Sequence, residues 1–168
     1  MRCHGMTALE ALIVVAVIGM LLAAAMPSAA EYMTNARIRG VAEQFRDGIS
    51  LARMEAIRRN TTVNFVANGT GWSVVVPAVG QTPTVTLASR SPYAAESAIT
   101  ASPSVDQIAF NGAGRLTTAG PFTVNVSQTS GTCAASGGSV RCLRISAVRG
   151  GNIRMCDPAQ ASSKPEGC

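Results

Sequence analysis

The feature that most constrains this protein is an uncharged, mostly apolar stretch near its N-terminus, which runs from Ala11 to Ala30. As an α-helix these 20 residues extend about 30 Å, which matches the hydrocarbon core of a bilayer. The stretch therefore predicts a membrane-spanning helix. Glu10 lies directly before it, and because an ionised carboxylate within a membrane is costly, we interpret this acid as a functional residue.

A cleaved signal peptide is the alternative interpretation, because the small residues between Ala25 and Ala30 offer a cleavage site of the A-x-A type. Against it, Gly5 offers an earlier cleavage site, Glu10 interrupts the front edge of the stretch, and the helical pattern continues without a break. Cleavage after Gly5 would place the new α-amino group on Met6, and Glu10 would lie one turn away on the same helix face. The amine and the carboxylate can then neutralise each other, within one molecule or between neighbouring molecules.

The stretch "GMTALEALIVVAVIGMLLAAAMP" resembles the type III signal of type IV pilins and type II secretion pseudopilins. In that signal a Gly precedes the cleavage site, the next residue becomes N-methylated, and a Glu is the fifth residue of the mature protein. Gly5, Met6 and Glu10 occupy these places, although Met6 replaces the usual Phe. Pro27 occupies the place of the usual helix proline. The resemblance implies that prepilin peptidase removes residues 1–5, and that Glu10 and Pro27 act in assembly.

Residues 31–60 continue the helix with an amphipathic pattern. Its apolar positions recur every three or four residues, at Ile38, Val41, Phe45, Ile49, Ala52 and Ala56. We predict one helix from Met6 to Arg59 with a kink at Pro27, because proline removes one hydrogen bond of the helix ladder. On the polar face, we expect Glu43 to pair with Arg46.

The segment "LARMEAIRRN", residues 51–60, ends this helix and precedes a β-branched run. Glu55 is expected to reach Arg58 and Arg59, and a solvated helix face is the simplest interpretation of these charges. The segment resembles the GspH/FimT family of minor pilins and pseudopilins, which includes FimU-like members. This resemblance implies an α+β, pilin-like fold, in which a long N-terminal helix packs on a C-terminal antiparallel β-sheet.

Residues 61–168 contain short β-branched runs between turn residues, which predicts a globular domain built on an antiparallel sheet. Asn68-Gly69 predicts the turn of a first hairpin. Residues 78–104 are rich in Pro, Ser, Ala and Thr, and predict a long loop with a short strand at Thr84–Leu87. Further strands are expected in "VDQIAF", in "PFTVNVSQ" and on both sides of Gly150-Gly151, which makes about six strands in meander order.

Four of the five cysteines lie near the C-terminus: Cys133, Cys142, Cys156 and Cys168. They form no CxxC pair, and the only His is His4, so a zinc site is disfavoured. Disulfides fit better and indicate an oxidising compartment such as the periplasm. Four cysteines allow three pairings. We favour the pairing of sequence neighbours, Cys133 with Cys142 and Cys156 with Cys168.

Enzymatic chemistry has little support in the sequence. Once residues 1–5 are removed no His remains, which excludes a Ser/His/Asp triad, and the carboxylates are scattered. Four glycines, Gly112, Gly114, Gly150 and Gly151, do not stand between a strand and a helix, as a phosphate-binding loop requires. We therefore interpret the protein as a non-enzyme without metal or other cofactor.

The net charge is +5, and all but one of the 14 basic residues are Arg. The segment "RGGNIRMCDP" resembles a C-terminal segment of FimT-type competence pilins that is linked to DNA binding. Gly151, Arg154, Cys156 and Pro158 match that segment, whereas Asn152 replaces an Arg. The resemblance implies a candidate DNA contact by four arginines, Arg149, Arg154, Arg144 and Arg115.

Two observations weaken the DNA hypothesis. Alternation along a strand would place Arg141 and Arg144 on opposite faces, so the arginines do not all converge. The aromatic residues available for base stacking are few, namely Trp72, Tyr93 and Phe122. The simpler interpretation is a solvated edge strand, whose arginines prevent it from pairing with another molecule.

Together these patterns predict a leader at 1–5, a transmembrane and filament-core helix at 6–30, an amphipathic helix at 31–60, and a β-domain at 61–168 with two disulfides. The leading hypothesis is a minor pilin of a type IV pilus, anchored in the inner membrane with its globular domain in the periplasm. Its partners would be prepilin peptidase and other pilins. The alternatives are an H-type pseudopilin of type II secretion, a DNA-binding minor pilin of natural transformation, and a secreted disulfide-bonded domain with a cleaved signal peptide.

Overall fold

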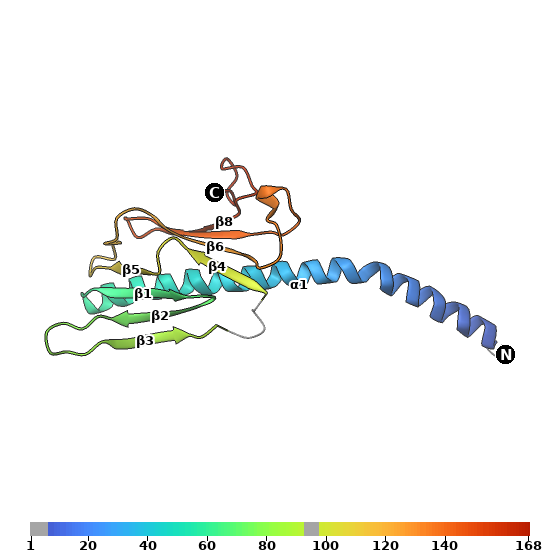
Figure 1. Cartoon of the computed structure of the whole chain (residues 1–168), viewed down its shortest axis with the longest axis horizontal. Helices are drawn as coiled ribbons and strands as arrows, with labels where there is room; N and C mark the ends of the chain where they lie inside the picture. The colour runs from blue at the N-terminus through green and yellow to red at the C-terminus, as the bar shows by residue number, and fades with distance from the viewer. Residues whose placement is uncertain (1–6, 93–97) are drawn as a thin grey trace, which may run out of the picture. The chain divides into compact units, whose positions relative to one another are not determined.

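The computed structural model describes residues 7–92 and 98–168, with only the backbone of residues 24–29 (Figure 1). Its first element is helix α1 (Ala8–Arg59). The protein divides into two compact units, residues 1–34 and 35–168, and each is considered by itself. The predicted leader, the cleavage residue Gly5 and the methylation residue Met6 lie outside the described residues.

The N-terminal unit is the first part of α1. Thr7 precedes the helix, and its Oγ1 accepts a hydrogen bond from the backbone N–H of Glu10 at 3.3 Å, as a residue that caps a helix N-terminus does. Large apolar side chains follow with high exposure, including Leu9 at 69%, Met20 at 75% and Leu21 at 66%. Within the described residues, no helical segment combines the length and the hydropathy that a membrane span requires.

Pro27 lies inside the helical part of the backbone, and its side chain is one of those not described. The predicted kink at this residue therefore stays a prediction.

The C-terminal unit contains the rest of α1 and all described strands. The predicted apolar stripe is confirmed, because its six members, Ile38, Val41, Phe45, Ile49, Ala52 and Ala56, are all at most 1% exposed. The helix is followed by Asn60, which has a positive φ of 48° and donates its backbone N–H to the carbonyl of Ile57. Asn tolerates this left-handed conformation, which terminates helices.

Eight strands form two four-stranded antiparallel sheets in the described part of this unit. The first sheet has the order β3-β2-β1-β5, with bounds Val85–Arg90, Gly71–Val76, Val63–Asn68 and Gln107–Phe110. The second has the order β4-β6-β7-β8, with bounds Ile99–Pro103, Phe122–Gln128, Leu143–Ala147 and Ile153–Cys156. A short 3-10 helix, η2 (Ala134–Ser136), lies between β6 and β7.

One hydrophobic core joins the helix to both sheets. Phe65 of β1 is at its centre, with ring centroids 6.1 Å from Phe45 of α1, 6.0 Å from Trp72 of β2 and 6.2 Å from Phe122 of β6. The ring of Trp72 lies against α1 at Gly48, where a Cβ would come within 2.7 Å of the ring. Both sheets are therefore packed on the same part of the helix.

The predicted single meander is wrong in one respect. Residues 78–104 are not a loop with one strand, because they contain β3 and also β4. β4 pairs with β6, with Ile99 opposite Gln128, and this pairing starts a second sheet instead of extending the first. Ile99 and Ala101 turn into the core, and burial of these two side chains stabilises a segment whose Ser- and Pro-containing sequence favours a loop.

The polar face of α1 carries the expected type of ion pair with one change. Glu55 accepts hydrogen bonds from Arg58 and from Arg59, as predicted. Glu43, however, pairs with Arg39, at 2.8 Å between Nε and Oε1, and not with Arg46. Both neighbours lie within helical reach of Glu43, and the sequence pattern alone does not select between them.

Candidate functional site

The candidate site lies where two turns of the globular unit meet. The first turn joins β5 to β6 and is organised by Asn111. Its side-chain Oδ1 accepts the backbone N–H groups of Ala113 at 3.1 Å and of Arg115 at 3.0 Å. Gly114 has a positive φ of 70° and donates its N–H to the carbonyl of Asn111 at 2.8 Å. This turn is therefore fixed by its own hydrogen bonds.

The second turn joins β7 to β8 and contains the Gly150-Gly151 pair. Gly151 has a φ of 80° and donates its N–H to the carbonyl of Val148 at 2.8 Å. A Cβ on Gly151 would overlap the carbonyl oxygen of Gly114, so no larger residue fits where the turns touch. Arg53 of α1 donates from Nε to that same carbonyl at 3.1 Å, which ties both turns to the helix.

Arg115 and Arg149 come together at this junction. The backbone N–H of Leu116 donates to the carbonyl of Arg149 at 3.2 Å. Between the turns lies an open pocket of ≈ 380 Å³. Its lining is Asn111, Arg115, Leu116, Thr117, Arg149 and Gly150. Both arginines are exposed, and within residues 7–92 and 98–168 neither guanidinium forms a hydrogen bond or an ion pair.

The other two arginines of the predicted DNA contact do not line this pocket. Arg144 and Arg154 lie on the face of the second sheet opposite the buried side chains of β7, since Arg154 pairs with Ser146. Arg144 donates from Nε to Asn125 Oδ1 at 2.7 Å. The structure therefore brings Arg115 and Arg149 together and places Arg144 and Arg154 elsewhere.

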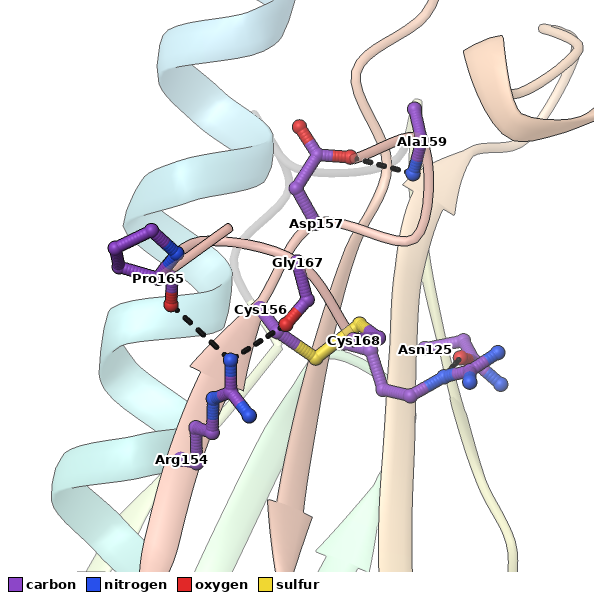
Figure 2. The surroundings of a disulfide bond; sticks show 9 residues. Asn125, Arg154, Cys156, Asp157, Ala159, Pro165, Gly167 and Cys168 are labelled. Atoms are coloured by element: carbon purple, nitrogen blue, oxygen red, sulfur yellow. Dashed lines mark hydrogen bonds between the residues drawn. A yellow bond between two sulfur atoms is a disulfide. The ribbon is translucent and has the colours of Figure 1, made fainter. Parts of the chain in front are cut away.

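Arg154 binds the C-terminal loop. Its Nη2 donates to the carbonyl of Pro165 at 3.1 Å and to that of Gly167 at 2.5 Å (Figure 2). The disulfide between Cys156 and Cys168 closes the same loop, and Figure 2 shows it beside the guanidinium. The second disulfide joins Cys133 to Cys142. These are the pairings of sequence neighbours that we favoured.

Asp157 is a structural residue that the sequence did not single out. Its carboxylate is 3% exposed and accepts hydrogen bonds from Arg141 Nε at 2.8 Å and from the backbone N–H of Ala159 at 2.9 Å. The backbone N–H of Arg141 donates to Asn35 Oδ1 of α1 at 3.1 Å. The C-terminal loop is thereby connected through Arg141 to the helix. No short motif marks such a network, because its members are far apart in sequence.

Two of the aromatic residues considered for base stacking, Phe122 and Trp72, pack in or against the hydrophobic core. Phe122 is 2% exposed and lies in the core, and Trp72 packs against Phe65 and Gly48. Tyr93 lies outside the described residues. In the described part of the protein, no three His, Cys, Asp or Glu side chains are close enough to hold a metal ion.

Glu55 is a carboxylate whose pKa is strongly shifted by its neighbours. Hydrogen bonds from Arg58 and then from Arg59 lower the pKa of Glu55 to about 2. In return, the hydrogen bond to Glu55 raises the pKa of Arg58. Glu55 is paired with both arginines at the end of α1, so this carboxylate is not a partner for the pocket arginines.

Comparison with known proteins identifies the family. Residues 41–151, more than half of the sequence, match the family described as type II transport protein GspH. A search of curated proteins found no match.

Two crystal structures of the type IV minor pilin FimU from Pseudomonas aeruginosa are similar to this fold, each with 22% sequence identity. One has a TM-score of 0.61 and covers 82% of this chain and 98% of its own; the other has 0.56, with 77% and 98%. The minor pseudopilin EpsH from the type 2 secretion system of Vibrio cholerae has a TM-score of 0.50 and 14% identity, covering 74% of this chain and 99% of its own. The protein has the α+β pilin-like fold and belongs to the GspH family of minor pilins and pseudopilins.

Proposed function

We propose that the protein is a minor pilin, which prepilin peptidase cleaves after Gly5 and which is then incorporated into a type IV pilus. The observation that carries this proposal is the exposed apolar surface of the first part of α1, from Leu9 to Leu22. A continuous apolar surface of this kind marks a site of contact with other proteins or with lipid. Before assembly, residues 11–30, a stretch that includes the side chains of residues 24–29 outside the described part, would hold the helix in the inner membrane, and the globular unit would lie in the periplasm.

Glu10 has a defined place in this proposal. It is the acidic residue in the first turn of α1, where the positive end of the helix dipole favours a carboxylate. Its neighbours Leu9, Leu12 and Ile13 are exposed and apolar. When these side chains are buried against other subunits, the carboxylate needs a cationic partner. The methylated α-amino group of Met6, on this or a neighbouring subunit, would supply one.

A pseudopilin of type II secretion is the alternative role, because the family includes both kinds of protein. One observation favours the pilus. The C-terminal region is braced by two disulfides, which suits a subunit that leaves the periplasm and is exposed at the cell surface.

Deletion of the gene in its own host distinguishes these roles. If the protein is a minor pilin, deletion removes or shortens surface pili and leaves the secretion of folded periplasmic proteins unchanged. If it is a pseudopilin, secretion falls and surface pili persist. The proposal fails if the deletion strain keeps its full number of pili.

DNA binding in natural transformation is a second candidate, supported by the exposed pair Arg115 and Arg149. The contact would be small, because Arg144 and Arg154 are bound to other groups of the protein. A gel shift with the purified full-length protein in detergent tests it. The double variant Arg115→Ala/Arg149→Ala should lose DNA affinity, and the affinity of the parent should fall with salt. Equal affinity of parent and variant would remove these two residues as the DNA contact.

A further inference from the structure

The pocket between the two turns carries positive charge that the described residues do not neutralise. Arg115 and Arg149 line it, and both guanidinium groups are exposed. The acidic side chains that form described ion pairs bind arginines outside the pocket. Glu43 pairs with Arg39, and Glu55 pairs with Arg58 and Arg59. Asp157 and Glu166 pair with Arg141. The two pocket arginines are therefore available to an anion from another molecule.

The backbone beneath these arginines is preorganised. Asn111 fixes the first turn through two hydrogen bonds to backbone N–H groups, and Arg53 fixes its contact with the second turn through Gly114. The backbones of Gly151 and Gly114 approach so closely that no side chain fits between the two turns. Rigid positions reduce the entropy that is lost when a ligand binds. The two turns are therefore suited to hold the side chains of Arg115 and Arg149 in place for a ligand.

The size and the lining of the pocket favour one anionic group over a long polyanion. The volume is ≈ 380 Å³, and the lining includes Leu116, which is 5% exposed and apolar, beside the two arginines. Duplex DNA is typically held by about 6–10 phosphate contacts spread along a surface. Other arginines of the globular unit, Arg53, Arg144 and Arg154, donate to groups of the protein itself and do not extend the charge of the pocket. Two planar guanidinium groups match a single carboxylate, which accepts paired hydrogen bonds.

We propose that Arg115 and Arg149 form a docking pocket for one carboxylate of a neighbouring filament subunit, supplied by an Asp or Glu side chain or by the C-terminus of that subunit. This inference rests on the proposed function, because it takes the partner from the filament. It adds which surface of the globular unit makes the contact and what chemistry it recognises. The apolar Leu116 would contact the aliphatic part of the entering residue.

The lysine content of the protein permits a direct test. Lys164 is the only lysine, so the variant Lys164→Arg has no lysine amine. In that background, Arg149→Lys or Arg115→Lys places one amine in the pocket and retains the positive charge. A carbodiimide joins an amine directly to a carboxylate that is in contact with it. Sheared filaments from cells that express each variant are treated, and mass spectrometry identifies the joined peptides.

The matched control is Arg144→Lys in the same background, because Arg144 lies outside the pocket and binds Asn125. The proposal predicts a product in which the pocket lysine is joined to an Asp, Glu or C-terminal carboxylate of another subunit, with no such product from the control. The identity of the joined residue distinguishes a side chain from a C-terminus. The proposal is overturned if the pocket variants are present in filaments and give no more product than the control.

Two further outcomes separate this inference from the proposed function. If immunoblots find no wild-type protein in the filaments, the proposed function fails. The carbodiimide treatment of the lysine variants is then applied to whole membranes. A product specific to the pocket lysine then supports the carboxylate site, and its absence contradicts it. If the gel shift shows DNA binding that Arg115→Ala/Arg149→Ala abolishes, while no carboxylate product forms, the pocket recognises phosphate and the proposal is wrong.

Discussion

Arg154 and Gly167 are joined by a hydrogen bond of 2.5 Å, from the guanidinium Nη2 to the backbone carbonyl. Gly167 precedes Cys168, which is bonded to Cys156, so the side chain and the disulfide fix the same loop from two directions. An arginine that resembles a DNA contact in sequence is therefore engaged in the fold. We therefore expect replacement of Arg154 to lower the stability of the protein, and not to act through lost DNA binding.

Arg154→Ala should lower the free energy of unfolding of the full-length protein in detergent by about 1–2 kcal/mol, because two carbonyl groups lose a charged donor. The measurement is urea denaturation followed by the fluorescence of Trp72, the only tryptophan. Arg149→Ala is the control and should change stability by at most about 0.5 kcal/mol, since it is exposed. Equal effects of the two variants would contradict a special role of Arg154.

Replacement of both Cys156 and Cys168 by Ser should lower the free energy of unfolding by about 2–4 kcal/mol, as removal of a short disulfide loop does. The loop spans 12 positions. Because Arg154 still binds Pro165 and Gly167, part of the loop structure should remain, and Arg154→Ala should destabilise this background more than it destabilises the parent. A protease that cuts on the N-terminal side of lysine, at the bond between Ser163 and Lys164, reports the order of the loop, since the bond after Lys164 precedes Pro165 and resists cleavage. Unchanged cleavage would mean that the disulfide does not fix the loop.

Gly48→Ala should destabilise the globular unit by about 1–3 kcal/mol, because the new methyl group overlaps a packed ring. A Cβ at this position would lie 2.7 Å from Trp72 and 3.0 Å from Phe65. Gly40 on the same helix is the matched control, because no atom lies within 4 Å of its Cβ position. Gly40→Ala should stabilise by about 0.5–1 kcal/mol through helix propensity. Effects of the same sign at the two positions would be evidence against the described packing of Trp72.

Acid should remove the stabilisation that Glu55 provides. The neighbouring arginines lower its pKa from 4.5 to about 2 in the folded state, so its contribution is present above pH 4.5 and is lost as the pH falls toward 2. Glu55→Gln should therefore make stability less dependent on pH in that interval. In the background Arg58→Gln/Arg59→Gln, the further change Glu55→Gln should no longer alter this dependence. A pH profile of denaturation midpoints that is the same in parent and Glu55→Gln would contradict the ion-pair cluster.

The helix was predictable because its signal is local. Positions such as Ile38, Phe45 and Ile49 repeat at helical spacing, and the same spacing places them on one buried face. The strand β4 was not predictable, because it forms by pairing with a distant strand, with Ile99 opposite Gln128. The strand propensity of its own five residues does not reveal that partner. The division into two sheets follows from that pairing.

The site was predictable in part for similar reasons. Arg115 and Arg149 were candidates from composition and from a family resemblance, but their proximity depends on a backbone hydrogen bond between Leu116 and Arg149. The acceptors of Arg154 are backbone carbonyls, which every residue has, so no motif indicates them. The cap at Thr7 has a sequence signal, a Thr three residues before Glu10, which is easily overlooked beside the much stronger signal of the apolar stretch.

The most direct test of the central claim is incorporation of the full-length protein into filaments with and without the carboxylate of Glu10. Wild-type, Glu10→Ala and, as a charge-retaining control, Glu10→Asp proteins are expressed in a strain that lacks the native copy. Immunoblots then compare the protein in sheared filaments with the protein in membranes. We predict that the wild type is in both fractions, that Glu10→Ala is confined to membranes, and that Glu10→Asp is intermediate. Normal amounts of Glu10→Ala in filaments would contradict the account.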